Sequence, residues 1–107
     1  MDLSQNHQQL QDNGYTIVEN LIDLNFVDEL VDEIKKLEIR LQRTPDNNRF
    51  EGNQTTRTYN LLAHGEIWQH IPVQPQVLEL IEGVIGEQCL VSSLASISLA
   101  PGETAQV

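Results

Sequence analysis

Three histidines and many carboxylates make a metal centre the first chemistry to consider in this sequence. His64, Glu66 and His70 together offer two imidazoles and one carboxylate, a ligand set that suits non-haem iron. A helix here would place Glu66 and His70 one turn apart on one face, but His64 would precede its start. A facial triad usually draws its distant histidine from another strand. We therefore expect no metal site here, with His64 in a loop or cap and His70 packed beside Trp68 or facing solvent. Trp68 itself is expected to be a core or interface residue.

Two residues are better candidates for binding an anionic small molecule. Arg57 opens an apolar stretch predicted as a strand over 57–62, so its guanidinium is expected to point into the fold. An unpaired buried charge is costly, and a carboxylate held by two hydrogen bonds is its natural partner. The alternative is an ion pair with an internal Asp or Glu. Gln106 lies on a predicted extended segment and could equally face solvent.

Other common catalytic motifs are absent from the sequence. It contains no Gly-rich phosphate loop, no paired cysteines for zinc and no G-x-S-x-G nucleophile turn. The serines near the end of the chain have no obvious base beside them and are expected to be small strand residues. The lone Cys89 forms no internal disulfide and is expected to be a buried thiol in a reducing compartment.

Charge and hydropathy restrict the partners further. The formal net charge is −10, which argues against nucleic acid and anionic membranes as partners because both require positive charge. An anionic small molecule stays possible as a ligand, since one buried arginine can attract it despite the negative potential of the whole protein. The polar N-terminus does not resemble a signal peptide, and no stretch is apolar enough for a membrane span. We therefore expect a cytoplasmic protein.

The elements that would position these residues can be predicted from apolar spacing. One apolar face at the helical period predicts a helix over 25–41, capped by Asp23 or Asn25. A second helix is expected over 75–85, with Pro75 in its first turn, and a short helix over 3–12 ahead of a Gly14 turn. Strands are expected over 15–20, 57–62 and 89–99. The last alternates an apolar face with a serine-rich face that is half exposed or lines a polar cavity.

The order of these segments resembles that of a known family. A Gly-Tyr-x-Ile-Val strand (14–18), an acidic helix, Arg-Thr-Tyr-Asn-Leu-Leu-Ala (57–63), a Gln-Pro-x-Val-Leu helix (74–86) and Ala-Pro-Gly-Glu-Thr-Ala-Gln (100–106) follow one another. This order resembles the N-terminal part of the phytanoyl-CoA dioxygenase family. The resemblance implies an α+β chain, with N-terminal helices and the first strands of an incomplete double-stranded β-helix, a jelly-roll or cupin-like barrel. Residues 1–107 would form part of one such domain.

The resemblance also implies a function and its cofactors. The family consists of Fe(II)/2-oxoglutarate-dependent oxygenases that hydroxylate small organic substrates. Its iron ligands include a His-x-Asp that follows the Pro-Gly-Glu-x-x-Gln segment, and this sequence reaches Val107 before any such motif. No catalytic or metal-binding residue is therefore assigned, and the chain alone is expected to be inactive and to bind no cofactor. Arg57 and Gln106 are implied to help bind 2-oxoglutarate.

The sequence leaves open the substrate, the oligomeric state and an alternative function. The substrate and the oligomeric state cannot be read from the sequence. The alternative function is a non-catalytic acidic interaction domain that uses the amphipathic helices over 25–41 and 75–85 to bind a protein partner.

Overall fold

The computed structural model describes residues 1–105 and shows an α+β chain, as the sequence predicts. The helices and strands are α1 (Ser4–Asn13), α2 (Leu24–Arg40), β1 (Thr55–Thr58), the 3₁₀ helix η1 (Leu61–Ala63), α3 (Glu66–Gln69), α4 (Pro75–Ile85) and β2 (Ser96–Leu99). The two strands form an antiparallel sheet, with Arg57 paired to Ile97.

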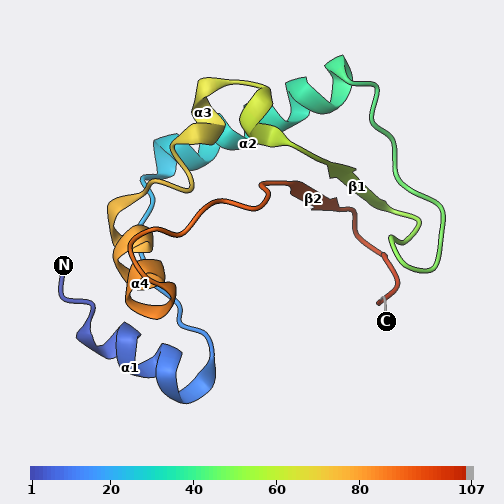
Figure 1. Ribbon diagram of the computed structural model, residues 1–107. Helices are drawn as coiled ribbons and strands as arrows, with labels where there is room; N and C mark the ends of the chain where they lie inside the picture. Colours follow the sequence, from blue (N-terminus) through green and yellow to red (C-terminus); the bar gives the residue numbers. More distant parts are fainter. Residues whose placement is uncertain (106–107) are drawn as a thin grey trace.

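The chain forms an open arch (Figure 1). Helices α2 and α3 make its top, the sheet makes one limb, and α4 with α1 makes the other. The radius of gyration of the Cα atoms is 16.1 Å, whereas a compact domain of this length has about 13 Å. The accessible surface is 8237 Å² for a mass of 12.1 kDa, against roughly 6,000 Å² for a compact monomer. The described chain therefore leaves much more surface exposed than a compact domain of the same size does.

The two amphipathic helices form because apolar spacing and caps agree. The Asp23 carboxylate accepts a hydrogen bond from the backbone N–H of Asn25 at 2.9 Å, which begins α2. The side-chain oxygen of Gln74 accepts from the backbone N–H of Val77 at 3.0 Å, and the proline in the first turn of α4 needs no partner for its nitrogen. Both predicted helices are confirmed, as are α1 and the left-handed Gly14 that ends it.

One small core holds the top of the arch together. Leu37 of α2, Leu61 of η1 and Trp68 of α3 are each 3% exposed and pack in one cluster. The backbone N–H of Leu61 donates to the carbonyl of Leu94 at 3.0 Å, which ties the approach to β2 to this cluster. The expectation that Trp68 belongs to the core is confirmed.

The predicted strands are wrong in their extents. Asn60 takes a left-handed conformation, with φ of 56°, so β1 ends at Thr58 and the chain turns into η1. Residues 89–95 and 15–20 form no strand at all, because no strand among the described residues pairs with them. Cys89, expected to be buried, is only half-buried.

Candidate functional site

The two faces of the sheet have different surroundings. On one face, the Ser98 hydroxyl donates to Glu38 of α2 at 2.8 Å, so this face packs toward α2. Side chains alternate along a strand, so Arg57 shares the opposite face with its pair partner Ile97 and with Leu99. Ile97 is 54% exposed and Leu99 is 64% exposed. Arg57 therefore lies beside an exposed apolar surface.

Arg57 itself is mostly buried, as the sequence predicts for an inward-pointing arginine. Its side chain is 18% exposed, and its Nε lies 3.7 Å from Oε2 of Glu51, so the internal ion pair forms at long range. That Nε is buried and has no hydrogen-bond partner among the described residues. A buried donor without a partner costs free energy until an acceptor arrives. Glu51 therefore satisfies Arg57 only in part.

Glu51 is held in place by its own loop. The Tyr59 hydroxyl donates to Oε2 of Glu51 at 2.8 Å, and the backbone N–H of Glu51 donates to the Asn48 side chain. The hydrogen bond from Tyr59 lowers the pKa of the Glu51 carboxyl most. A bond that the Asn48 side-chain amide donates to Oε1 of Glu51 at 3.3 Å lowers it further, and Arg57 adds a smaller effect. The same bond to Glu51 raises the pKa of Tyr59. Glu51 therefore stays ionised beside Arg57 at neutral pH.

Arg43 fixes the backbone of this site from the end of α2. Its Nε donates to the carbonyl oxygen of Arg57 at 2.7 Å, and its guanidinium lies 3.9 Å from Asp46. The backbone N–H of Asp46 in turn donates to the carbonyl of Thr55 at 3.2 Å. These contacts set the position of β1 relative to α2, and hence the direction in which Arg57 points.

Glu103 makes a set of hydrogen bonds that the sequence analysis did not predict. Its carboxylate accepts hydrogen bonds from the Thr55 hydroxyl at 2.7 Å, from the backbone N–H groups of Asn53 and Gln54, and from that of Thr104. The hydrogen bond from the Thr55 hydroxyl lowers the pKa of Glu103 most. Desolvation raises that pKa, the backbone donors lower it again, and the resulting pKa is about 2. The carboxylate thereby clamps the turn after β2 onto the start of β1.

The sequence does contain a signal from which this clamp could have been predicted. Pro101 and Gly102 form a tight turn, with Gly102 at φ of 89°, and Glu103 follows immediately. A turn there folds the next residue back toward the neighbouring strand. The resemblance singled out this segment for Gln106, which lies outside the described residues, and gave Glu103 no role.

A polar cleft of about 510 Å³ adjoins the clamp. Its lining includes Asn48, Arg49, Asn53 and Glu103, and Arg57 is not part of it. The cleft and the sheet face that carries Arg57 are therefore separate features.

The described residues do not fit an iron centre. His64 follows η1, Glu66 begins α3, and His70 ends α3 with an exposed side chain. Across residues 1–105, no group of three or more His, Cys, Asp or Glu side chains could hold a metal ion.

Comparisons with known proteins do not add to this description. No family model and no solved structure matches the chain. In residues 1–105, no helix has both the length and the apolar character that crossing a membrane requires.

Proposed function

We propose that the chain is the N-terminal portion of an Fe(II)/2-oxoglutarate-dependent dioxygenase of the phytanoyl-CoA dioxygenase type, which hydroxylates a small organic substrate. In this proposal, residues 1–107 contribute helices and the first strands of a double-stranded β-helix. Other polypeptide would supply the remaining strands and the iron ligands, and the chain alone would be inactive.

The observation that carries the proposal is the uncovered sheet beside a partly satisfied arginine. Ile97 and Leu99 expose an apolar face on a sheet of only two described strands, and Arg57 shares that face. Barrel folds cover such faces and pair such edges. The accessible surface of 8237 Å² exceeds the compact-monomer value by roughly 2,200 Å², which is consistent with a sheet that further strands would complete.

Arg57 would act by binding and orienting the cosubstrate. Its unpartnered Nε and partial burial suit a carboxylate, which a guanidinium binds through two parallel hydrogen bonds. Glu51 competes for the same charge, so the isolated chain should retain no cosubstrate as a resident cofactor and should bind an added carboxylate only weakly. The bound iron would supply the oxidising chemistry, and the residues of this chain would position the cosubstrate and exclude water.

The test is a titration of the full chain with 2-oxoglutarate, followed by NMR. The expected result is a weak, saturable shift of the Arg57 side-chain Hε signal and of the β1 amides. Arg57→Lys should remove it, because an ammonium cannot reproduce the two-pronged geometry. Arg49→Lys is the matched control, since Arg49 lines the separate polar cleft. The dimethyl ester of 2-oxoglutarate should cause no shift in any variant.

Two outcomes would contradict the proposal. One is binding that survives Arg57→Lys unchanged, which would exclude Arg57 as the carboxylate ligand. The other is iron-dependent 2-oxoglutarate turnover by the isolated chain, which would contradict the expectation that the iron ligands lie elsewhere. Reading the coding sequence beyond the Val107 codon is an independent test. A His-x-Asp encoded soon after that codon would support the proposal, and a stop codon there would contradict it.

A further inference from the structure

A second surface of the arch lies away from the sheet, between the start of α2 and the segment that joins α3 to α4. Two adjoining hollows of about 360 Å³ and about 650 Å³ share Phe26, His70 and Gln74 in their linings. Both volumes fall within the range of ligand sites in proteins. We call the two hollows together the α2–α4 groove.

The floor of the α2–α4 groove is apolar. Leu21, Ile22, Phe26, Ile71, Pro72 and Val77 line the smaller hollow together with few polar groups. Val73, at the rim of the larger hollow, is 56% exposed, and Ile22 is 46% exposed. Apolar side chains of a partner could therefore be buried here without displacing the core around Trp68.

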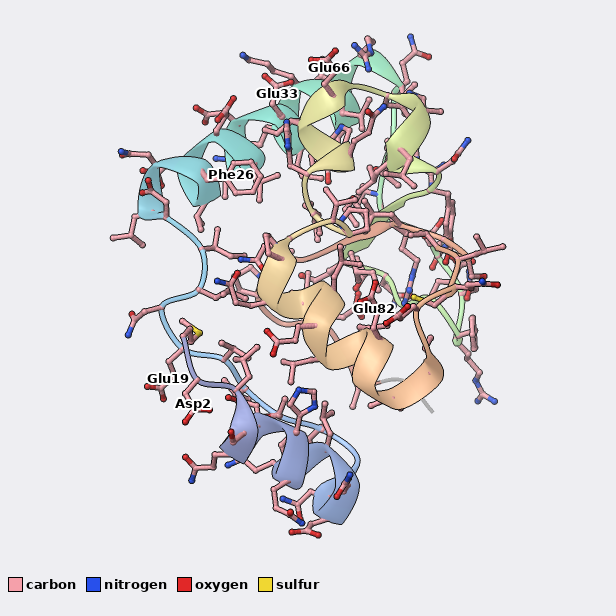
Figure 2. All side chains as sticks on the ribbon, turned by 60° about the vertical axis from the view of Figure 1, so that its left-hand side comes forward. Asp2, Glu19, Phe26, Glu33, Glu66 and Glu82 are labelled. Atoms are coloured by element: carbon pink, nitrogen blue, oxygen red, sulfur yellow. The ribbon has the colours of Figure 1, made fainter. Side chains whose placement is uncertain are left out.

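The rim of the groove is acidic. Among the described residues that line either hollow, the charged carboxylic side chains are Asp23, Glu29 and Glu66, and neither Lys nor Arg occurs. All three are exposed, so each can meet a cation, although one oxygen of Asp23 also accepts the capping hydrogen bond from the backbone N–H of Asn25. In Figure 2, Phe26 on α2 and Glu66 at the start of α3 lie in the upper part of the view, away from α1. The negative rim belongs to a chain with a net charge of −10, so the long-range field attracts cations as well.

We infer that the α2–α4 groove binds a basic peptide segment of a protein partner, with one or two apolar side chains on the groove floor and Lys or Arg side chains at its rim. Charge complementarity selects this occupant over a second copy of the chain, because two copies would bring like charges together. It also disfavours an anionic membrane surface, which the same field repels. An apolar floor with a charged rim is the arrangement by which helical peptides dock into protein grooves. This site is independent of Arg57 and of the oxygenase proposal.

The experiment measures fluorescence anisotropy of a labelled Ala-rich helical peptide with Leu and Phe one turn apart and several Lys side chains. Saturable binding to the full chain that weakens as salt rises is expected, since the rim pairs are exposed. A peptide with Glu in place of every Lys should not bind. A peptide with Ser in place of Leu and Phe should bind at least about tenfold more weakly, because the apolar anchors carry most of the affinity.

Variants of the chain locate the site. Phe26→Ser should weaken binding by about tenfold, with circular dichroism used to verify that α2 persists. The exposed pair Glu29→Gln and Glu66→Gln leaves the apolar packing unchanged and should weaken binding about three- to tenfold while reducing its salt dependence. Glu79→Gln with Val84→Ser, on exposed positions of α4 outside the groove, is the matched control and should bind like the wild type.

Three results would contradict the inference that the α2–α4 groove binds a basic peptide. Equal binding of the Lys and Glu peptides would exclude the acidic rim as the determinant. Binding that responds to the α4 control but not to the rim pair would place the contact elsewhere. Failure of the Lys peptide to bind at low salt would exclude the groove as a site for basic segments.

Discussion

The Glu103 clamp makes a prediction about acid stability. The carboxylate bridges the turn after β2 to the start of β1 through the Thr55 hydroxyl and the backbone N–H groups of Asn53 and Gln54. Protonation converts an acceptor of several hydrogen bonds into a group that must donate one. Glu103→Gln has a similar consequence at every pH, because its amide retains only one acceptor oxygen. Either change should release the turn from β1.

The pKa fixes the pH range in which the clamp acts. The folded-state pKa of Glu103 is about 2, against an ordinary value of 4.5. Because the folded-state pKa is depressed, the unfolded chain takes up a proton first as the pH falls. The stabilisation is therefore complete above pH 4.5 and is lost progressively as the pH falls from 4.5 toward 2. In the Glu103→Gln variant, the free energy of unfolding should no longer include this contribution to its pH dependence. The variant should also be less stable than the wild type at neutral pH.

NMR titration of the Glu103 side-chain carboxyl carbon measures the effect directly. The expected midpoint is about 2, with the amide signals of Asn53 and Gln54 shifting over the same range. Glu87→Gln, a change of the same charge in the exposed segment after α4, is the control and should leave the sheet amides unchanged. A Glu103 midpoint near 4.5, or Asn53 and Gln54 amides that ignore its titration, would refute the clamp.

Two further predictions concern the packing that supports the arch. Leu37→Ala should lower the free energy of unfolding by about 2–5 kcal/mol in urea denaturation, because the side chain is buried in the core. Ile39→Ala on the exposed side of α2 should stay within about 0.5 kcal/mol; equal effects at both positions would contradict the assigned core. Gly83→Ala should speed amide exchange in α1, because the new Cβ would lie 2.7 Å from Cε1 of His7. Adding His7→Ala should restore the protection, and its failure to do so would exclude the clash as the cause.

The helices could be predicted from the sequence because the signals that define them are local. The apolar stripe of α2 and its Asp23 cap lie within one segment, and the same holds for α4 with Gln74 and Pro75. Trp68, expected in the core or at an interface, lies in the core. A helix satisfies its own backbone, so its existence depends little on distant residues.

The strands could not be predicted as well, because a strand depends on partners distant in sequence. The composition of residues 15–20 favours a strand, yet Tyr15 and Ile17 are 64% and 73% exposed and pair with no strand. Alternation over 89–99 predicts a long strand, but pairing with β1 covers only Ser96–Leu99. The clamp was missed for the same reason, since Glu103 meets donors that lie about fifty positions earlier in the chain.

The arch carries its uncovered surface in two places with different chemistry, and this separates the two proposals. The sheet face beside Arg57 combines apolar residues with a cation, whereas the α2–α4 groove combines apolar residues with carboxylates. A dicarboxylate should be attracted to the first and repelled by the second, and a basic peptide should behave in the opposite way. The Arg57→Lys substitution should therefore leave peptide binding intact, and the Glu29 and Glu66 substitutions should leave the 2-oxoglutarate response intact. If one set of substitutions weakened both ligands, the two surfaces would not be independent, and a single loss of folding at the top of the arch would explain both results better.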